Sequence, residues 1–156
     1  MTTKDAFTEE EWTRIVRAPF VAGLAISLAD PGGPIEAAKE TMATLKSATN
    51  PPSREQLLAE VALDVQSMTQ QKKHPLKGYK PPSGAQVLDE LRAAKDLVVA
   101  KATPEETAAF GSWLMASAQA AAEAAKEGGF MGFRAQRVSE GEQAMLDEVS
   151  KAVSAG

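Results

Sequence analysis

One short pattern recurs along this chain and constrains its fold more than any other feature. In this pattern Ser or Thr is followed three residues later by Glu or Gln, and the two side chains cap the amides of a helix start reciprocally. It occurs at five places: Thr8–Glu11, Ser53–Gln56, Ser83–Gln86, Thr103–Glu106 and Ser139–Glu142. Phe7 and Trp12 flank the first of these at the two positions of a hydrophobic staple. The chain is therefore predicted to consist of several well-delimited helices.

Clusters of proline and glycine between these starts are expected to end the helices. Alanine, the best helix former, supplies 29 of the 156 residues, and no segment alternates as a strand would. Helices are predicted over 8–29, 34–48, 54–72, 84–102, 104–127 and 140–154. The first is predicted to kink or restart at Pro19, since proline removes a helical hydrogen bond. The expected fold is an all-α, single-domain bundle of about six helices over 8–156, behind a flexible N-terminus at 1–7.

Apolar residues at helical spacing predict the faces that form the core. The predicted stripes are Ile35, Ala38, Met42 and Leu45; Leu58, Val61, Val65 and Met68; Leu88, Leu91, Ala94 and Val98; and Met145, Val149 and Val153. The fifth helix carries no charge from Thr107 to Ala122, and the first carries none from Ala18 to Ala29. Both runs are shorter than the roughly 20 residues that a bilayer requires. They are predicted to form the inner pair of the bundle, with no membrane span.

Composition excludes several kinds of chemistry. Cysteine is absent, and there is one histidine, so disulfides, thiolate catalysis and sites with two imidazoles are ruled out. No nucleophile elbow, phosphate-binding loop or dinucleotide-binding fingerprint occurs. The leading hypothesis is a non-enzymatic interaction or scaffold protein that self-associates. The alternatives are a module that binds a small molecule or divalent cation and, third, a carboxylate-dependent enzyme. The acidic N-terminus is unlike a secretory signal, which predicts a cytoplasmic protein.

A basic segment between the third and fourth helices is the strongest candidate binding site. Residues 72–84 carry a charge of +4, whereas the segments before and after them each carry −4. The candidate anion- or partner-binding residues are Lys72, Lys73, His74, Lys77, Tyr79 and Lys80. An acidic partner is expected, and nucleic acid is disfavoured because the remaining surface is negative. The other interpretation is a solvated connector. The neighbouring lysines predict a neutral His74 at pH 7.

The turn after the first helix is a candidate metal site. Asp30 precedes a glycine turn, and Glu36 and Glu40 follow it on the next helix. Carboxylates gathered in this way suit a hard divalent cation, which prefers oxygen ligands. The alternative is that Asp30 ends one helix while Glu36 favours the positive N-terminus of the next. No other cofactor is predicted.

An apolar, glycine-rich linker at 128–138 is a candidate contact surface. Phe130 is predicted to pack back onto the bundle, because it directly follows a helix end. An interface with a second subunit or another protein is predicted at Phe133, Arg134 and Arg137. A Phe→Ala change is expected to cost about 3–5 kcal/mol at a packed site and to dissociate an oligomer at an interface.

Two stretches, Ala18–Gly33 and Glu127–Glu142, resemble small all-helical bacterial proteins of uncharacterised function. The Ala-Asp-Pro-Gly-Gly turn and the Val-Ser-x-x-Glu phrase are also similar to those of the tellurite-resistance TerB-like family. That resemblance implies a metal-associated stress role, with Asp30 and Glu36 as the corresponding positions. Pro31 interrupts the Asp-Gly pair of that family, and no second Ala-Asp-Gly turn appears in this chain.

Overall fold

The computed structural model describes residues 2–29, 34–77, 79–80, 83–127 and 140–154. Six α-helices make up this part of the chain, and no strand occurs in it. They are α1 (Glu9–Ala29), α2 (Pro34–Ala48), α3 (Gln56–Gln70), α4 (Gly84–Lys101), α5 (Pro104–Glu127) and α6 (Glu140–Val153). The predicted all-α bundle is confirmed, and each helix begins and ends within two residues of its predicted bounds.

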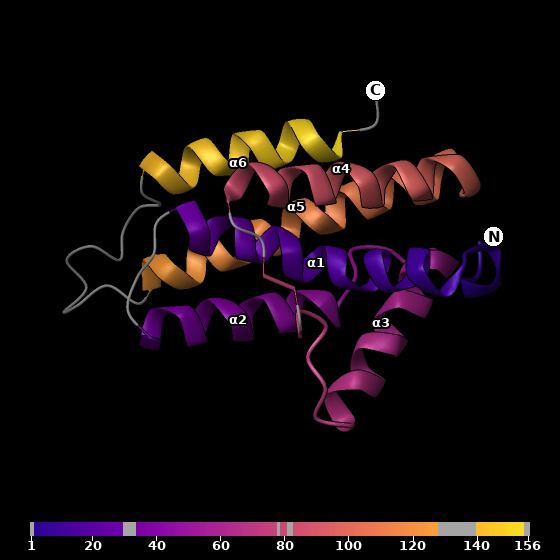
Figure 1. Cartoon of the computed structure of the whole chain (residues 1–156), viewed down its shortest axis with the longest axis horizontal. Coiled ribbons are helices and arrows are strands. Elements are labelled where there is room, and N and C mark those ends of the chain that lie inside the picture. Colours follow the sequence, from indigo (N-terminus) through magenta and orange to yellow (C-terminus); the bar gives the residue numbers. More distant parts are fainter. Residues whose placement is uncertain (1, 30–33, 78, 81–82, 128–139, 155–156) are drawn as a thin grey trace.

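The two helices that contain the long uncharged runs, α1 and α5, lie at the centre of the bundle, as predicted. α1 and α5 each contact all the other helices, while α4 and α6 cover one side and α2 and α3 the other (Figure 1). Their largest fully buried side chains are Phe20 and Ile15 on α1 and Trp113 and Phe110 on α5. α1 continues as one helix through Pro19, so it does not restart there.

α1 alone among the described helices is long and apolar enough to pass a test for a membrane span. In the bundle 61% of its most apolar window is buried by the other helices. The core helix of a soluble protein passes the same test, because its buried face is apolar.

The stripe predicted for α2 is only partly right: Leu45 packs partly buried against the core, but Ala38 and Met42 are exposed, because this helix turns a polar face inward. Met42 is 71% exposed, whereas Glu40 and Thr44 are 2% and 3% exposed. The Glu40 carboxylate accepts a hydrogen bond of 2.9 Å from Ser27 of α1, and Thr44 donates to the backbone carbonyl of Glu40 at 2.8 Å. A Cβ at Gly23 of α1 would lie 2.3 Å from Thr44 Oγ1. The absence of a side chain at Gly23 thus permits a close approach that places small polar groups in the interface.

Two of the predicted capping boxes form in full. The backbone N–H of Thr8 donates to Glu11 at 2.8 Å while that of Glu11 donates to Thr8 at 3.1 Å, and Thr103 and Glu106 repeat this pairing. The Phe7 and Trp12 rings pack with their centroids 5.8 Å apart, which confirms the staple.

The other boxes differ from this pattern. At Ser83 only the hydroxyl half forms, at 3.4 Å to the amide of Gln86. The box predicted at Ser53 is wrong, since α3 begins at Gln56 with no side-chain cap from the residue before it. The predicted box at Ser139 lies outside the described residues.

The buried Glu106 carboxylate joins three separate parts of the chain. It accepts hydrogen bonds from the backbone N–H and hydroxyl of Thr2, at 3.0 and 2.5 Å, and from the amides of Leu57 and Thr103, both at 3.2 Å. It therefore caps the first turn of α3 as well as its own helix. Burial alone would raise the pKa of this carboxyl, but the four hydrogen bonds outweigh it and lower the pKa to about 2. These bonds hold Thr2, within the segment predicted to be flexible, against the bundle.

Candidate functional site

The basic connector between α3 and α4, residues 71–83, begins with a tight helix end. The amide of Lys72 donates to Thr69 O at 3.0 Å and that of Lys73 to Met68 O at 2.8 Å, which is the Schellman pattern. Lys72 has a φ of 59°, a left-handed conformation that glycine usually supplies at this position. The connector thus leaves α3 in a defined direction.

Its middle is held against α1. Pro75 is buried, and Leu76 is half-buried against the core. The His74 ring lies edge-on to Phe20, with centroids 5.2 Å apart, and its Nδ1 accepts the Leu76 amide at 3.1 Å. Burial lowers the pKa of His74. This direction agrees with the predicted preference for the neutral form, although its cause is desolvation instead of the lysines.

Tyr79 of the connector lies beside a charged cluster on α1 and α4. Arg17 lies over the Tyr79 ring at 4.5 Å from its centroid. Glu90 of α4 accepts two bonds of 3.0 Å from Arg14 and one of 3.4 Å from Arg17. Burial alone would raise the pKa of Glu90, but these arginines lower it. Tyr79 is therefore half-buried in this cluster, where burial followed by the charge of Glu90 raises its pKa.

The four lysines of the connector all face outward. Lys72, Lys73, Lys77 and Lys80 are exposed, and none makes an ion pair among the described residues. The candidate residues thus separate into two sets: the rings of His74 and Tyr79 contact side chains of α1, whereas the lysines form a basic surface. The connector combines an anchored backbone with unpaired positive charge.

The left-handed conformation of Lys72 at the start of the connector can be tested by substitution. Replacing Lys72 with glycine is expected to raise the free energy of unfolding by about 0.5–1 kcal/mol, because glycine adopts this conformation without a steric penalty. Chemical denaturation would measure the change. Lys73→Gly is the matched control, and it is expected to give no gain because Lys73 is not left-handed. A loss of stability in Lys72→Gly would contradict the assigned backbone.

The predicted metal site is only partly within the described structure. Asp30 lies outside the described residues, and so does the side chain of Glu36. Glu40 is buried between α1 and α2, with Ser27 as a hydrogen-bond partner. Among the described residues, no group of three His, Asp or Glu side chains could hold a metal ion. The residues predicted to form an interface, Phe133, Arg134 and Arg137, also lie outside the described part, as does Phe130.

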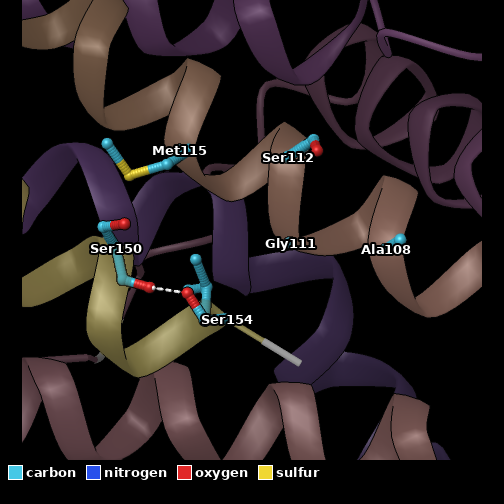
Figure 2. A pocket seen from close by; sticks show the side chains of 7 residues that line it. Ala108, Gly111, Ser112, Met115, Ser150 and Ser154 are labelled. Carbon is cyan, nitrogen blue, oxygen red and sulfur yellow. Dashed lines mark hydrogen bonds between the residues drawn. The ribbon is translucent and has the colours of Figure 1, made fainter. Parts of the chain in front are cut away.

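A shallow hollow between α5 and α6 has little chemistry to offer. Figure 2 shows its lining of mostly small side chains, with Ser112 and Met115 on α5, Ser150 on α6 and Ser154 just after the end of α6. The hydroxyl of Ser154 donates a hydrogen bond to the backbone carbonyl of Ser150 at 2.5 Å. None of the described residues that line it has a titratable side chain. Close packing explains its shape, since a Cβ at Gly111 would lie 2.7 Å from Val153 O.

The basic connector is therefore the candidate site that the structure describes best. Sequence spacing alone could not reveal Arg14, Arg17 and Glu90 as its supports, because they come from helices far apart in the chain. Comparisons with protein-family models, curated proteins and solved structures found no match for this chain.

Proposed function

We propose that this chain is a non-enzymatic helical interaction protein that self-associates by docking its basic connector onto an acidic surface of a second copy. The observation that supports this most is the anchored connector itself. Lys72, Lys73, Lys77 and Lys80 are exposed, and the described part of the connector is held by backbone hydrogen bonds at Lys72 and Lys73 and by ring contacts at His74 and Tyr79. A solvated connector would need none of these contacts. Order already present in the free protein lowers the entropy cost of association.

The same chain offers a complementary acidic surface. Asp5, Glu9, Glu10 and Glu105 are all exposed. The hydrogen bonds between Thr2 and Glu106 bring the N-terminus beside the start of α5, so the segments that carry these carboxylates lie at one end of the bundle (Figure 1). An acidic end and a basic connector on different surfaces favour contact between copies, with the potentials steering the encounter.

The proposal is tested by reversing the charge of the connector. Lys72, Lys73, Lys77 and Lys80 are changed together to glutamate, and the association constant is measured by sedimentation equilibrium at low salt. The exposed lysines touch nothing that holds the fold, so helix content should be unchanged. The association constant is expected to fall about tenfold or more, since each close pair across the contact becomes repulsive.

A control variant separates the connector from net charge. Lys39, Arg54, Arg92 and Lys151 are exposed on other surfaces, and reversing them changes the net charge equally. This variant should keep most of the association. High salt should strongly weaken the self-association of the unmodified protein, because about 1 M salt shortens the screening length to about 3 Å. A monomer at every concentration in low salt, or equal losses in both variants, would contradict the proposal.

A further inference from the structure

A separate hollow of about 300 Å³ opens between α1, α3 and the connector. Val16 of α1, Met68 of α3 and Pro75 of the connector supply apolar walls. Val16 is 4% exposed and Pro75 is buried, so these walls belong to the packed core. Its volume is at the lower end of the range for small-ligand pockets, which combine apolar walls with a few fixed polar groups.

One carboxylate in this hollow is held in a fixed orientation. Trp12 Nε1 donates to Asp64 Oδ2 at 2.6 Å, and Lys4 Nζ lies 3.3 Å from the same oxygen. Among the described residues, none donates a hydrogen bond to Asp64 Oδ1. The side chain of Asp64 is 34% exposed. The hollow therefore presents the partly desolvated Asp64 carboxylate, whose Oδ1 can accept a hydrogen bond from a ligand.

Lys4 does not close this site. Its side chain is 57% exposed, and it reaches Asp64 through one ion pair on a long flexible stem. Exposed ion pairs of this kind contribute little to stability. A ligand that carries a cation on an apolar body can replace Lys4 at Asp64, since its body can pack against Val16, Met68 and Pro75. Met68 can adapt to different shapes, because methionine is unbranched and flexible.

We infer that this hollow binds a small apolar molecule that carries a primary ammonium group, with the ammonium on Asp64 and the apolar part on Val16, Met68 and Pro75. A charge-assisted hydrogen bond to a preoriented carboxylate is stronger than one between neutral groups. An anionic ligand would be repelled by Asp64, and a neutral one would lose the charge-assisted bond. The site is distinct from the outward-facing lysines of the connector and does not depend on self-association.

The inference is tested with three probes of similar size: 2-phenylethylamine, 2-phenylethanol and phenylacetate. Binding is followed by the indole N–H resonance of Trp12 in ¹⁵N-resolved spectra, assigned with Trp12→Phe. Trp113 is an internal reference, because it is fully buried with its indole N–H donating to Ser47 O at 2.7 Å. The amine should shift the Trp12 resonance with millimolar affinity, about fivefold tighter than the alcohol, and phenylacetate should bind weakest.

Two variants assign the preference to this carboxylate. Asp64→Asn should remove the preference of the amine over the alcohol, whereas Asp89→Asn, an exposed carboxylate on α4, should leave it intact. Lys4→Met keeps the fold and frees Asp64, so amine binding should tighten about twofold to fivefold. Equal affinities for amine and alcohol, a shift at Trp113 instead of Trp12, or no tightening in Lys4→Met would overturn the inference. The Lys4 variant makes the test independent of whether Asp64→Asn folds.

Discussion

Replacing Glu106 with glutamine is expected to lower the free energy of unfolding by about 3 kcal/mol at pH 7. The pKa of this carboxyl is lowered from 4.5 to about 2, and each pKa unit corresponds to about 1.4 kcal/mol between the two protonation states. Glutamine keeps the size of the side chain but directs an amide group at the donors of Thr2, Leu57 or Thr103. At least one donor then loses its partner in a buried site.

The pH dependence gives this prediction a second readout. The folded-state pKa is depressed, so the contribution of Glu106 is fully present above about pH 4.5 and is lost as the pH falls toward 2. Denaturant unfolding of the two proteins across this interval should give free energies that converge in acid. Glu105→Gln is the matched control, because Glu105 is the exposed neighbour and should change stability by less than about 0.5 kcal/mol. A constant difference from pH 7 to pH 2 would show that the Glu106 charge is unimportant.

Replacing Gly23 with alanine is expected to lower the free energy of unfolding by about 2–3 kcal/mol. The new Cβ would lie 2.3 Å from Oγ1 and 2.9 Å from Cγ2 of Thr44, distances that real structures do not tolerate. Thr44 cannot move away easily, since it is 3% exposed and its hydroxyl donates to Glu40 O at 2.8 Å. α1 and α2 must therefore separate, as in an overpacked core.

A double-mutant cycle with Thr44→Ala isolates this clash. The second change removes both of the closest atoms and leaves the Cβ of residue 44 at 3.1 Å, so the double variant should recover about 1–2 kcal/mol of the loss. Thermal or denaturant unfolding of the four proteins measures the coupling. Strictly additive losses would mean that the helices do not cross at Gly23.

Much of the fold was predictable because its determinants are local. The boxes at Thr8 and Thr103, with the proline and glycine clusters, are enough to place helices within two residues. Ser53 shows where this local logic fails. The first turn of α3 obtains its cap from Glu106, which lies 49 residues further along the chain. A rule that reads four consecutive residues cannot detect a carboxylate supplied by another helix.

The α2 error and the connector have a similar explanation. Apolar spacing favoured Met42 as a core residue, but the contact at Gly23 needs small or hydrogen-bonded groups, so Thr44 and Glu40 face inward instead. In the connector, charge alone identified the lysines. Its ordered shape depends on the left-handed backbone of Lys72, and a lysine in the sequence does not predict that conformation. It also depends on the contacts of Arg17 with Tyr79 and Glu90. Such pairings become visible only when the helices are placed in space.

Amide hydrogen exchange in the connector tests the central claim most directly, that its basic surface is already ordered in the free protein. The amides of Lys72, Lys73, Lys77 and Tyr79 donate to backbone carbonyls at 2.8–3.0 Å. At low protein concentration and high salt, where copies stay apart, these four amides should exchange at least about tenfold more slowly than in an unfolded chain. The amide of Lys80, which has no acceptor among the described residues, should exchange fast. Exchange of all five at the unfolded rate would contradict the account.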